Sequence, residues 1–294
     1  MLGKKFLIPG VVLGLCFSLG VLAVESTSST ATAPATKAPR SSLTAAQIVE
    51  KHLAARGGLA AWRAVQTLSL AGKMEAGSGS TDVSRRLAVE RRRAGRAPAV
   101  KPGESAAEQQ VLLPFVLEMK RPGKSRVEIE FAGKTAVQVY DGTQGWKKRP
   151  FLNRDDVEPF TEAEAKSEQG KAELDGPLVD YAAKGTKVEL AAVEPVEGHD
   201  AYKLKLTTKS GTVQHVWIDA ASFLDVKVEG IPRRMDGKMH NVYVYQRDFR
   251  SVQGVMIPFV LETAVEGYPG THKMLIEKAL VNPKLDDSRF VKPT

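Results

Sequence analysis

The stretch that decides the fold is Arg126-Val-Glu-Ile-Glu-Phe-Ala-Gly-Lys-Thr-Ala-Val-Gln-Val-Tyr-Asp141. Apolar side chains recur in it at every second position, and charged residues alternate with them in its first half. A period of two with one apolar side predicts antiparallel strands with one buried face and one wet face. We expect five of its apolar side chains to share the concave face of such a sheet: Val127, Ile129, Phe131, Val137 and Val139.

The same period runs through most of the chain from Thr67 onward, with turn signals such as Asp141-Gly142 and Pro269-Gly270 between the runs. No βαβ rhythm is present, so the pattern predicts a long, curved antiparallel sheet packed on a few helices, mainly β with α (α+β). The predicted strands are Thr67–Glu75, Ser84–Arg91, Leu112–Lys120, Arg126–Phe131, Thr135–Asp141, Lys187–Pro195, Ala201–Thr207, Val213–Asp219, Phe223–Val228, Asn241–Arg247, Val255–Val265 and Met274–Val281.

Three helices are expected beside these strands. Thr44-Ala-Ala-Gln47 has the form of a capping box and predicts a helix to about Arg56, which Gly57-Gly58 ends. A short second helix, Leu59–Val65, carries Trp62. The Ala-, Glu- and Lys-rich stretch Thr161–Leu174 predicts the third helix.

Residues 1–23 have the plan of a secretory signal peptide, with Lys4 and Lys5 before an apolar run. An uncleaved membrane anchor is the alternative, because the run is close to the length that spans a bilayer. Cys16 is the only cysteine, and Leu15 before it disfavours lipid attachment there. The sequence therefore predicts export to the periplasm and a mature chain without cysteine.

The Ser-, Thr-, Ala- and Pro-rich residues 24–43 cannot form a core, and we expect them to be a flexible linker. Residues 44–294 are enough for one sizeable core, so a single domain is predicted there.

Most of the formal net charge of +8 comes from one basic insertion at residues 85–101. Behind a secretion signal this cluster does not favour nucleic-acid binding, and anionic lipid headgroups suit it better. The alternative is a solvated loop without a partner. The basic surface is predicted at Arg85, Arg86, Arg91, Arg92, Arg93 and Arg96.

Residue patterns typical of catalysis or of metal and cofactor sites are scarce. The five histidines form no H-E-x-x-H pattern, and neither a nucleophile elbow nor a phosphate-binding glycine loop occurs. His215 and Asp219 lie four residues apart on a predicted strand, but no third ligand accompanies them, so an outward-facing polar row is favoured over half a metal site. We therefore expect no enzymatic activity, no cofactor and no metal.

Five segments resemble the superfamily of the periplasmic outer-membrane lipoprotein carrier, the LolA and LolB group. The clearest is the ending Asn282-Pro-Lys-Leu-Asp-Asp-Ser-Arg-Phe-Val-Lys-Pro293, a strand end followed by a plug, which resembles N-P-x-L-x-D-x-x-F-x-x-P. The other four occur in the order of the family: Leu117–Arg126, Val139–Trp146, Val216–Leu224 and Phe249–Pro258. The basic insertion at residues 85–101 and the greater length are departures from the well-studied carriers.

This resemblance implies an incomplete antiparallel β-barrel, a half-barrel sheet lidded by a few helices. A half-barrel cannot fill its apolar interior, and an acyl chain that enters it gains about 0.8 kcal/mol per buried methylene. An ordinary filled core would show the same sequence pattern. The expected lining is Trp62, Leu117, Met119, Val127, Ile129, Phe131, Val137, Val139 and Trp146.

The function predicted on these grounds is non-enzymatic binding of lipid or of lipoprotein acyl chains in the periplasm, for lipoprotein sorting or transport to the outer membrane. The expected partners are lipid or an acylated lipoprotein, with a membrane surface or an envelope protein as a further partner. We expect a monomer that binds no nucleic acid. The alternative is a sensor or regulatory interaction module of the same fold, for which the basic insertion would be the docking surface.

Overall fold

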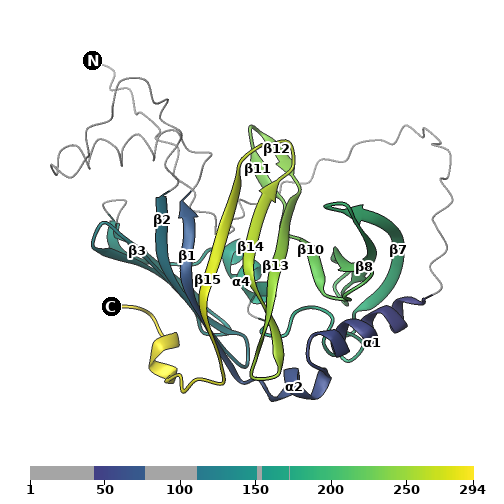
Figure 1. The fold of residues 1–294 in the computed structure, drawn as a ribbon. Coiled ribbons are helices and arrows are strands. Elements are labelled where there is room, and N and C mark those ends of the chain that lie inside the picture. The colour runs from purple at the N-terminus through teal and green to yellow at the C-terminus, as the bar shows by residue number, and fades with distance from the viewer. Residues whose placement is uncertain (1–42, 77–110, 151–153, 172) are drawn as a thin grey trace, which may run out of the picture.

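The structure, a computed structural model, describes residues 43–76, 111–150, 154–171 and 173–294 (Figure 1). Its main feature is one antiparallel sheet of 13 strands in the order β6-β5-β4-β3-β2-β1-β15-β14-β13-β10-β9-β8-β7. The last strand, β15, pairs with the first, β1, so these two strands lie side by side in the middle of the sheet. The end strands β6 and β7 pair on one side only, so the sheet is not closed. The predicted fold class, mainly β with an open half-barrel sheet, is confirmed.

The strand bounds agree with the sequence pattern at most positions. The predicted strand Ser84–Arg91 and the whole basic insertion lie outside the described residues, while β5, β6 and the hairpin β11–β12 were not predicted. The strands are β1 Thr67–Ala76, β2 Val111–Lys120, β3 Lys124–Phe131, β4 Lys134–Tyr140, β5 Gly145–Arg149, β6 Arg154–Pro159, β7 Lys187–Val196, β8 His199–Thr207, β9 Val213–Asp219, β10 Asp225–Glu229, β11 Arg233–Met235, β12 Lys238–His240, β13 Val242–Val252, β14 Val255–Val265 and β15 Thr271–Val281.

The first two helices form where the sequence predicts them. Helix α1, Ala45–Ala55, begins with a complete capping box between Thr44 and Gln47. Gly57 ends it at φ +106°, and a Cβ at Gly57 would lie 2.0 Å from the carbonyl oxygen of Gly254. Only glycine allows this close approach of the α1–α2 link to the turn between β13 and β14. Helix α2, Leu59–Ala64, follows at once.

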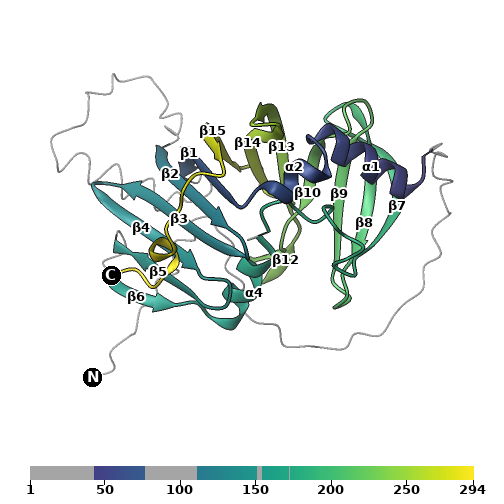
Figure 2. The same ribbon diagram turned by 90° about the horizontal axis from the view of Figure 1, so that it is seen from below.

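The sheet curves from β6 to β7, and α4 and β12 lie within the curve (Figure 2). The cross-strand register keeps one continuous inner face, on which two apolar clusters form. The larger one, which we call the central core, lies under β1–β3, β14 and β15. The second, which we call the α1 core, lies between α1 and strands β8 and β9.

The C-terminal segment after β15 covers the outer face of the sheet. Asn282 accepts hydrogen bonds from the backbone of Gln66 and Thr67, which ties this segment to the start of β1. The 3-10 helix η2, Asp287–Phe290, then places Phe290, 1% exposed, against Val137 and Val139. The predicted plug is therefore present, and it fills the outer face of β4.

In the described part of the chain, no helix combines the length and apolarity needed to cross a membrane. The expected signal peptide and linker, residues 1–43, lie almost wholly outside the described residues.

Candidate functional site

One cross-strand row runs over the inner face from the middle of the sheet towards its β6 edge. The register aligns Leu70 with Leu117, Leu117 with Val127, Val127 with Gln138, and Gln138 with Lys147. Residues aligned in this way point to the same face of a sheet. The row is therefore apolar over β1–β3 and becomes polar over β4 and β5.

The predicted lining residues of β2, β3 and α2 lie together on this inner face. Trp62, Met119, Val127 and Ile129 are buried members of the central core, with exposed fractions between 1% and 8%. Leu117 and Phe131 pack against that core but remain half-buried. Six of the nine predicted residues are thus brought together, and their role in binding a ligand stays a prediction.

The expectation that Val137 and Val139 share this face is wrong. The register pairs Phe131 with Lys134, so Val137 lies opposite Glu128, on the outer face. Val139 aligns with Trp146, which places Trp146 on the outer face as well. Alternation shows that a strand has two faces, and only the pairing across the hairpin decides which of them is the inner one.

Val137 does line a hollow of about 390 Å³ on this outer face, beside the C-terminal segment. Arg126, Lys148 and Lys292 also line it. These cationic walls suit an apolar chain poorly, because they would lose hydration without a partner.

Two apolar side chains of the inner face were not among the predicted lining residues. Leu261 of β14 and Met274 of β15 are aligned with each other, and both are half-buried against the central core. The alternation of Val255–Val265 was visible in the sequence, but the sequence did not predict which strands would pair with β14 and β15. Their position next to β1 follows from the β1–β15 pairing, which joins strands far apart in the sequence and has no local sequence signal.

Helix α2 closes the lower end of the central core through Trp62. The indole Nε1 of Trp62 donates a hydrogen bond of 2.9 Å to the carbonyl oxygen of Arg56. The Arg56 guanidinium lies 4.1 Å from the centre of the Trp62 ring, a cation–π contact. Burial lowers the pKa of Arg56, and the nearby Asp225 and Asp175 carboxylates oppose this shift.

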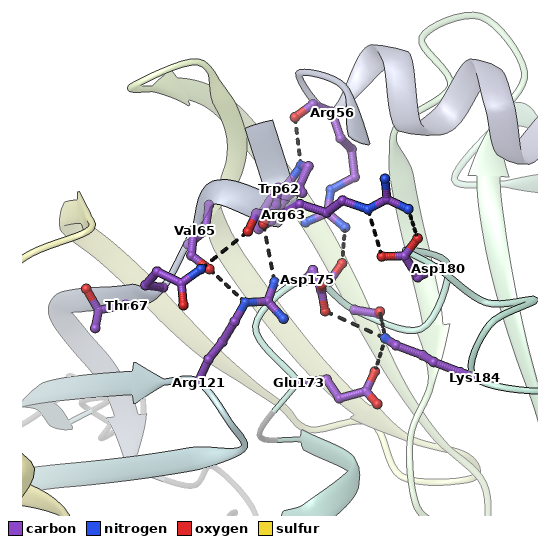
Figure 3. A network of polar contacts seen from close by, with 12 residues as sticks. Arg56, Trp62, Arg63, Val65, Thr67, Arg121, Glu173, Asp175, Asp180 and Lys184 are labelled. Atoms are coloured by element: carbon purple, nitrogen blue, oxygen red, sulfur yellow. Dashed lines mark hydrogen bonds and ion pairs between the residues drawn. The ribbon is translucent and has the colours of Figure 1, made fainter. Parts of the chain in front are cut away.

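A polar network below the central core holds α2 in place (Figure 3). Arg121 at the end of the β2–β3 hairpin donates to the carbonyl oxygens of Val65 and Trp62 and to Asp175, the last at 2.7 Å. Asp175 is 4% exposed, and its own carbonyl oxygen accepts a hydrogen bond from Arg56 at 3.0 Å. Asp175 therefore links α1, α2 and the β2–β3 hairpin.

The outer part of this network, which Figure 3 also draws, contains the exposed or partly exposed side chains of Arg63, Glu173, Asp180 and Lys184. Lys184 contacts Glu173 at 2.7 Å and Asp175 at 3.7 Å. Arg63 makes a two-pronged contact with Asp180, and these hydrogen bonds hold the pKa of Asp180 below its usual range. Exposed pairs of this kind contribute little to stability.

Helix α4, Glu162–Lys171, covers the polar end of the inner face near β5. Lys147 of β5 contacts Glu164 of α4 at 2.6 Å, and each side chain is only 7% exposed. Ser125 of β3 donates to Glu168 of α4 at 2.9 Å. The third predicted helix is therefore present, somewhat shorter than Thr161–Leu174, and its contacts with the sheet include a buried ion pair.

The remaining candidate residues do not converge. His215 lies 2.6 Å from Glu229, while Asp219 accepts hydrogen bonds from the backbone of Ala221 and Ser222 in the following turn. Among the residues that the structure describes, no three His, Cys, Asp or Glu side chains are grouped to hold a metal ion. The six arginines of the predicted basic surface lie outside the described residues.

No protein-family model and no curated protein matches this chain. Several solved structures are similar to it. A LolA superfamily protein from Nitrosomonas europaea is 15% identical with a TM-score of 0.49, and the match covers 85% of this chain and 99% of that protein. A domain assigned to outer membrane lipoprotein sorting, from Vibrio parahaemolyticus, is 11% identical with a TM-score of 0.49 over 83% and 94% of the two chains.

A DUF1329 family protein from Desulfovibrio piger is 13% identical with a TM-score of 0.53, and the match covers 84% of this chain and 97% of that one. Of these three structures only the last has a TM-score above 0.5, and its sequence identity to this chain is low. What the likeness shows is a common fold, and the fold does not fix a function.

Proposed function

We propose that this protein binds a lipid, or the acyl chains of a lipoprotein, on the inner face of its half-barrel sheet, without catalysing a reaction. The observation that carries the proposal is a group of half-buried apolar side chains next to a fully buried core. Leu117, Phe131, Leu261 and Met274 come from four strands and share this face. In a complete core these side chains would be fully buried. An acyl chain that packs against them would bury them, and each methylene removed from water would contribute about 0.8 kcal/mol of binding free energy.

The same proposal places the protein in the periplasm, with residues 1–23 as its export signal and residues 44–294 as its binding domain. Sorting or transport of lipoproteins to the outer membrane is the role that the sequence resemblance to the carrier superfamily favours.

Native mass spectrometry of the mature chain, purified from a bacterial periplasm, tests the proposal. We expect added mass that solvent extraction identifies as lipid or acylated peptide. A bare mass that is unchanged after incubation with palmitate would remove the proposed function.

A pair of variants tests the location. Leu117→Glu places a charge on the half-buried inner face, while Leu280→Glu places one on the outer side of β15, where Leu280 is 39% exposed. We expect Leu117→Glu to abolish lipid uptake and Leu280→Glu to leave it unchanged, with both variants folded by circular dichroism. Equal uptake by the two variants would place the ligand elsewhere.

A further inference from the structure

The apolar inner face ends at a buried lysine. Lys147 lies in the cross-strand row that contains Leu117 and Val127, three strands away from Leu117. With about 4.8 Å between neighbouring strands, the two residues are roughly 14 Å apart. A ligand that covers the half-buried apolar side chains and extends along this row reaches Lys147.

The helix that covers Lys147 is held by polar contacts. The buried residues of α4 are Glu164, Ser167 and Glu168, and no α4 residue belongs to the central core. An amphipathic helix normally turns its apolar side to a sheet, and that side supplies its stability. Helix α4 makes no such contribution to the central core, and its described contacts with the sheet include the Lys147–Glu164 ion pair and the Ser125–Glu168 hydrogen bond.

Among the described ion-pair contacts of Lys147, the one with Glu164 is the shorter. Glu158 on β6 lies 3.9 Å from the Lys147 ammonium, but it also binds Arg149 at 2.8 Å. Glu168, which contacts Ser125, lies 3.4 Å from Lys171 of its own helix. Glu164 makes the short contact at 2.6 Å, and it comes from the element that covers the site.

We propose that the inner face selects amphiphiles with an anionic headgroup, a carboxylate or a phosphate, and that Lys147 binds this headgroup in the position that the Glu164 carboxylate occupies in the structure. The inference rests on the proposed function and specifies, in addition, that the headgroup of the ligand is negatively charged. Glu164 acts as an internal stand-in for the headgroup, and entry of the ligand exchanges one carboxylate or phosphate for another on the same ammonium.

The selectivity follows from the short contact between Lys147 and a carboxylate. A ligand with an anionic headgroup that displaces Glu164 restores this contact, whereas an uncharged ligand removes it without a replacement at a lysine that is only 7% exposed. Hydrogen bonds to charged groups are among the stronger ones in proteins, so we expect about tenfold or greater preference for the anion.

The first experiment compares palmitate with hexadecanol, which has the same chain length and an uncharged headgroup, on the full mature protein by isothermal titration calorimetry. We expect palmitate to bind about ten times more tightly than hexadecanol. Acetate in large excess should leave palmitate binding unchanged, because the headgroup alone lacks the apolar contacts.

Variants of the ion pair identify the residue. The double variant Lys147→Met with Glu164→Met removes both charges, so neither is left buried alone, and it should bind the two ligands equally. Glu164→Gln should tighten the binding of both ligands, because neither of them then has to displace the Glu164 carboxylate from Lys147. Lys148→Met is the matched control, because Lys148 points to the outer face, where it contacts the carbonyl oxygen of Thr294.

Three outcomes would contradict the inference, and each has its own meaning. Equal binding of palmitate and hexadecanol by the unmodified protein would remove the headgroup selectivity and leave the proposed function intact. Displacement of palmitate by acetate would indicate a simple anion site. Binding of neither amphiphile would remove the proposed function itself.

Discussion

The two ends of the inner face are each covered by a helix, and the two helices are attached in different ways. At the β7 end, Ile48 and Val49 of α1 pack on Leu204, Val216 and Ile218, all between 0% and 2% exposed. At the β6 end, α4 contacts the sheet through Glu164 and Glu168.

The difference indicates which end of the protein is able to open. Apolar burial is non-directional and additive, so separating α1 from the sheet would expose several fully buried side chains at once. A buried ion pair gains much less net free energy, because both charges lose their hydration. We infer that α1 is a permanent part of the core and that α4 is a removable cover.

The α4 end is stabilised instead from the outer face of the sheet. Phe290 packs against Val137 and Val139 there, and Arg289 contacts Glu118 at 2.5 Å. The C-terminal segment therefore supports β2–β4 without occupying the inner face, which stays available for a ligand.

The largest expected effect is that of removing this outer support. Phe290→Ala should lower the free energy of unfolding by about 3–5 kcal/mol, because it empties a fully buried site. Urea unfolding followed by circular dichroism measures the change, with Val291→Ala, at a site 54% exposed, as the control. A loss no larger than that of the control would show that β2–β4 do not need the C-terminal segment.

A similar or slightly smaller loss is expected in the α1 core. Leu204→Ala should cost about 2–5 kcal/mol, since Leu204 is 0% exposed between α1 and the sheet. Its binding of palmitate should match that of the unmodified protein under conditions where both are folded. Weaker binding by folded Leu204→Ala would mean that the two ends of the inner face are not independent.

Loss of the α4 ion pair should have a local effect. In Glu164→Gln the buried Lys147 ammonium loses its short contact, and local opening of α4 keeps the loss of unfolding free energy below the roughly 3–5 kcal/mol typical of a broken buried pair. Hydrogen exchange of the α4 amides should rise clearly, while exchange in α1 stays the same. Glu50→Gln, at an exposed position of α1, is the control, and unchanged α4 exchange in Glu164→Gln would contradict a polar attachment.

The smallest expected effect concerns pH. Burial and, to a lesser degree, the charge of Arg233 lower the pKa of His272, on the inner face of β15. Between the lowered pKa and about pH 6.5, His272 binds more protons in the unfolded chain than in the folded protein. The stability that neutral His272 contributes to the folded protein is therefore present above about pH 6.5 and is lost as the pH falls through the lowered pKa. Between pH 7 and pH 5 the unmodified protein should lose more stability than His272→Asn.

His199→Asn, at an exposed histidine, should follow the unmodified protein over the same pH range. If His272→Asn loses as much stability as the unmodified protein between these pH values, His272 makes no such contribution.

Local patterns in the sequence were enough to predict the sheet and the first two helices. The capping box at Thr44 and the alternation in Val255–Val265 are local signals, and both elements formed at the predicted residues or within one of them. Strands β5 and β6 were missed, because Gly145–Arg149 and Arg154–Pro159 are short and mostly charged or polar, so neither shows the apolar alternation by which a strand is recognised.

The site was predicted less well, because it depends on which strands pair. Val127 and Ile129 could be assigned to a face from their own strand, but Val139 could not be related to them without the register of the hairpin. Lys147 had no apolar pattern around it. Its place at the end of the apolar row follows only from the pairing of β2, β3, β4 and β5.

Hydrogen–deuterium exchange of the full mature protein, with and without palmitate, tests the central difference between the two ends most directly. The account predicts that palmitate changes the exchange of α4, Glu162–Lys171, and leaves that of α1, Ala45–Ala55, unchanged. Equal changes in both helices, or no change in α4 when palmitate is bound, would contradict it.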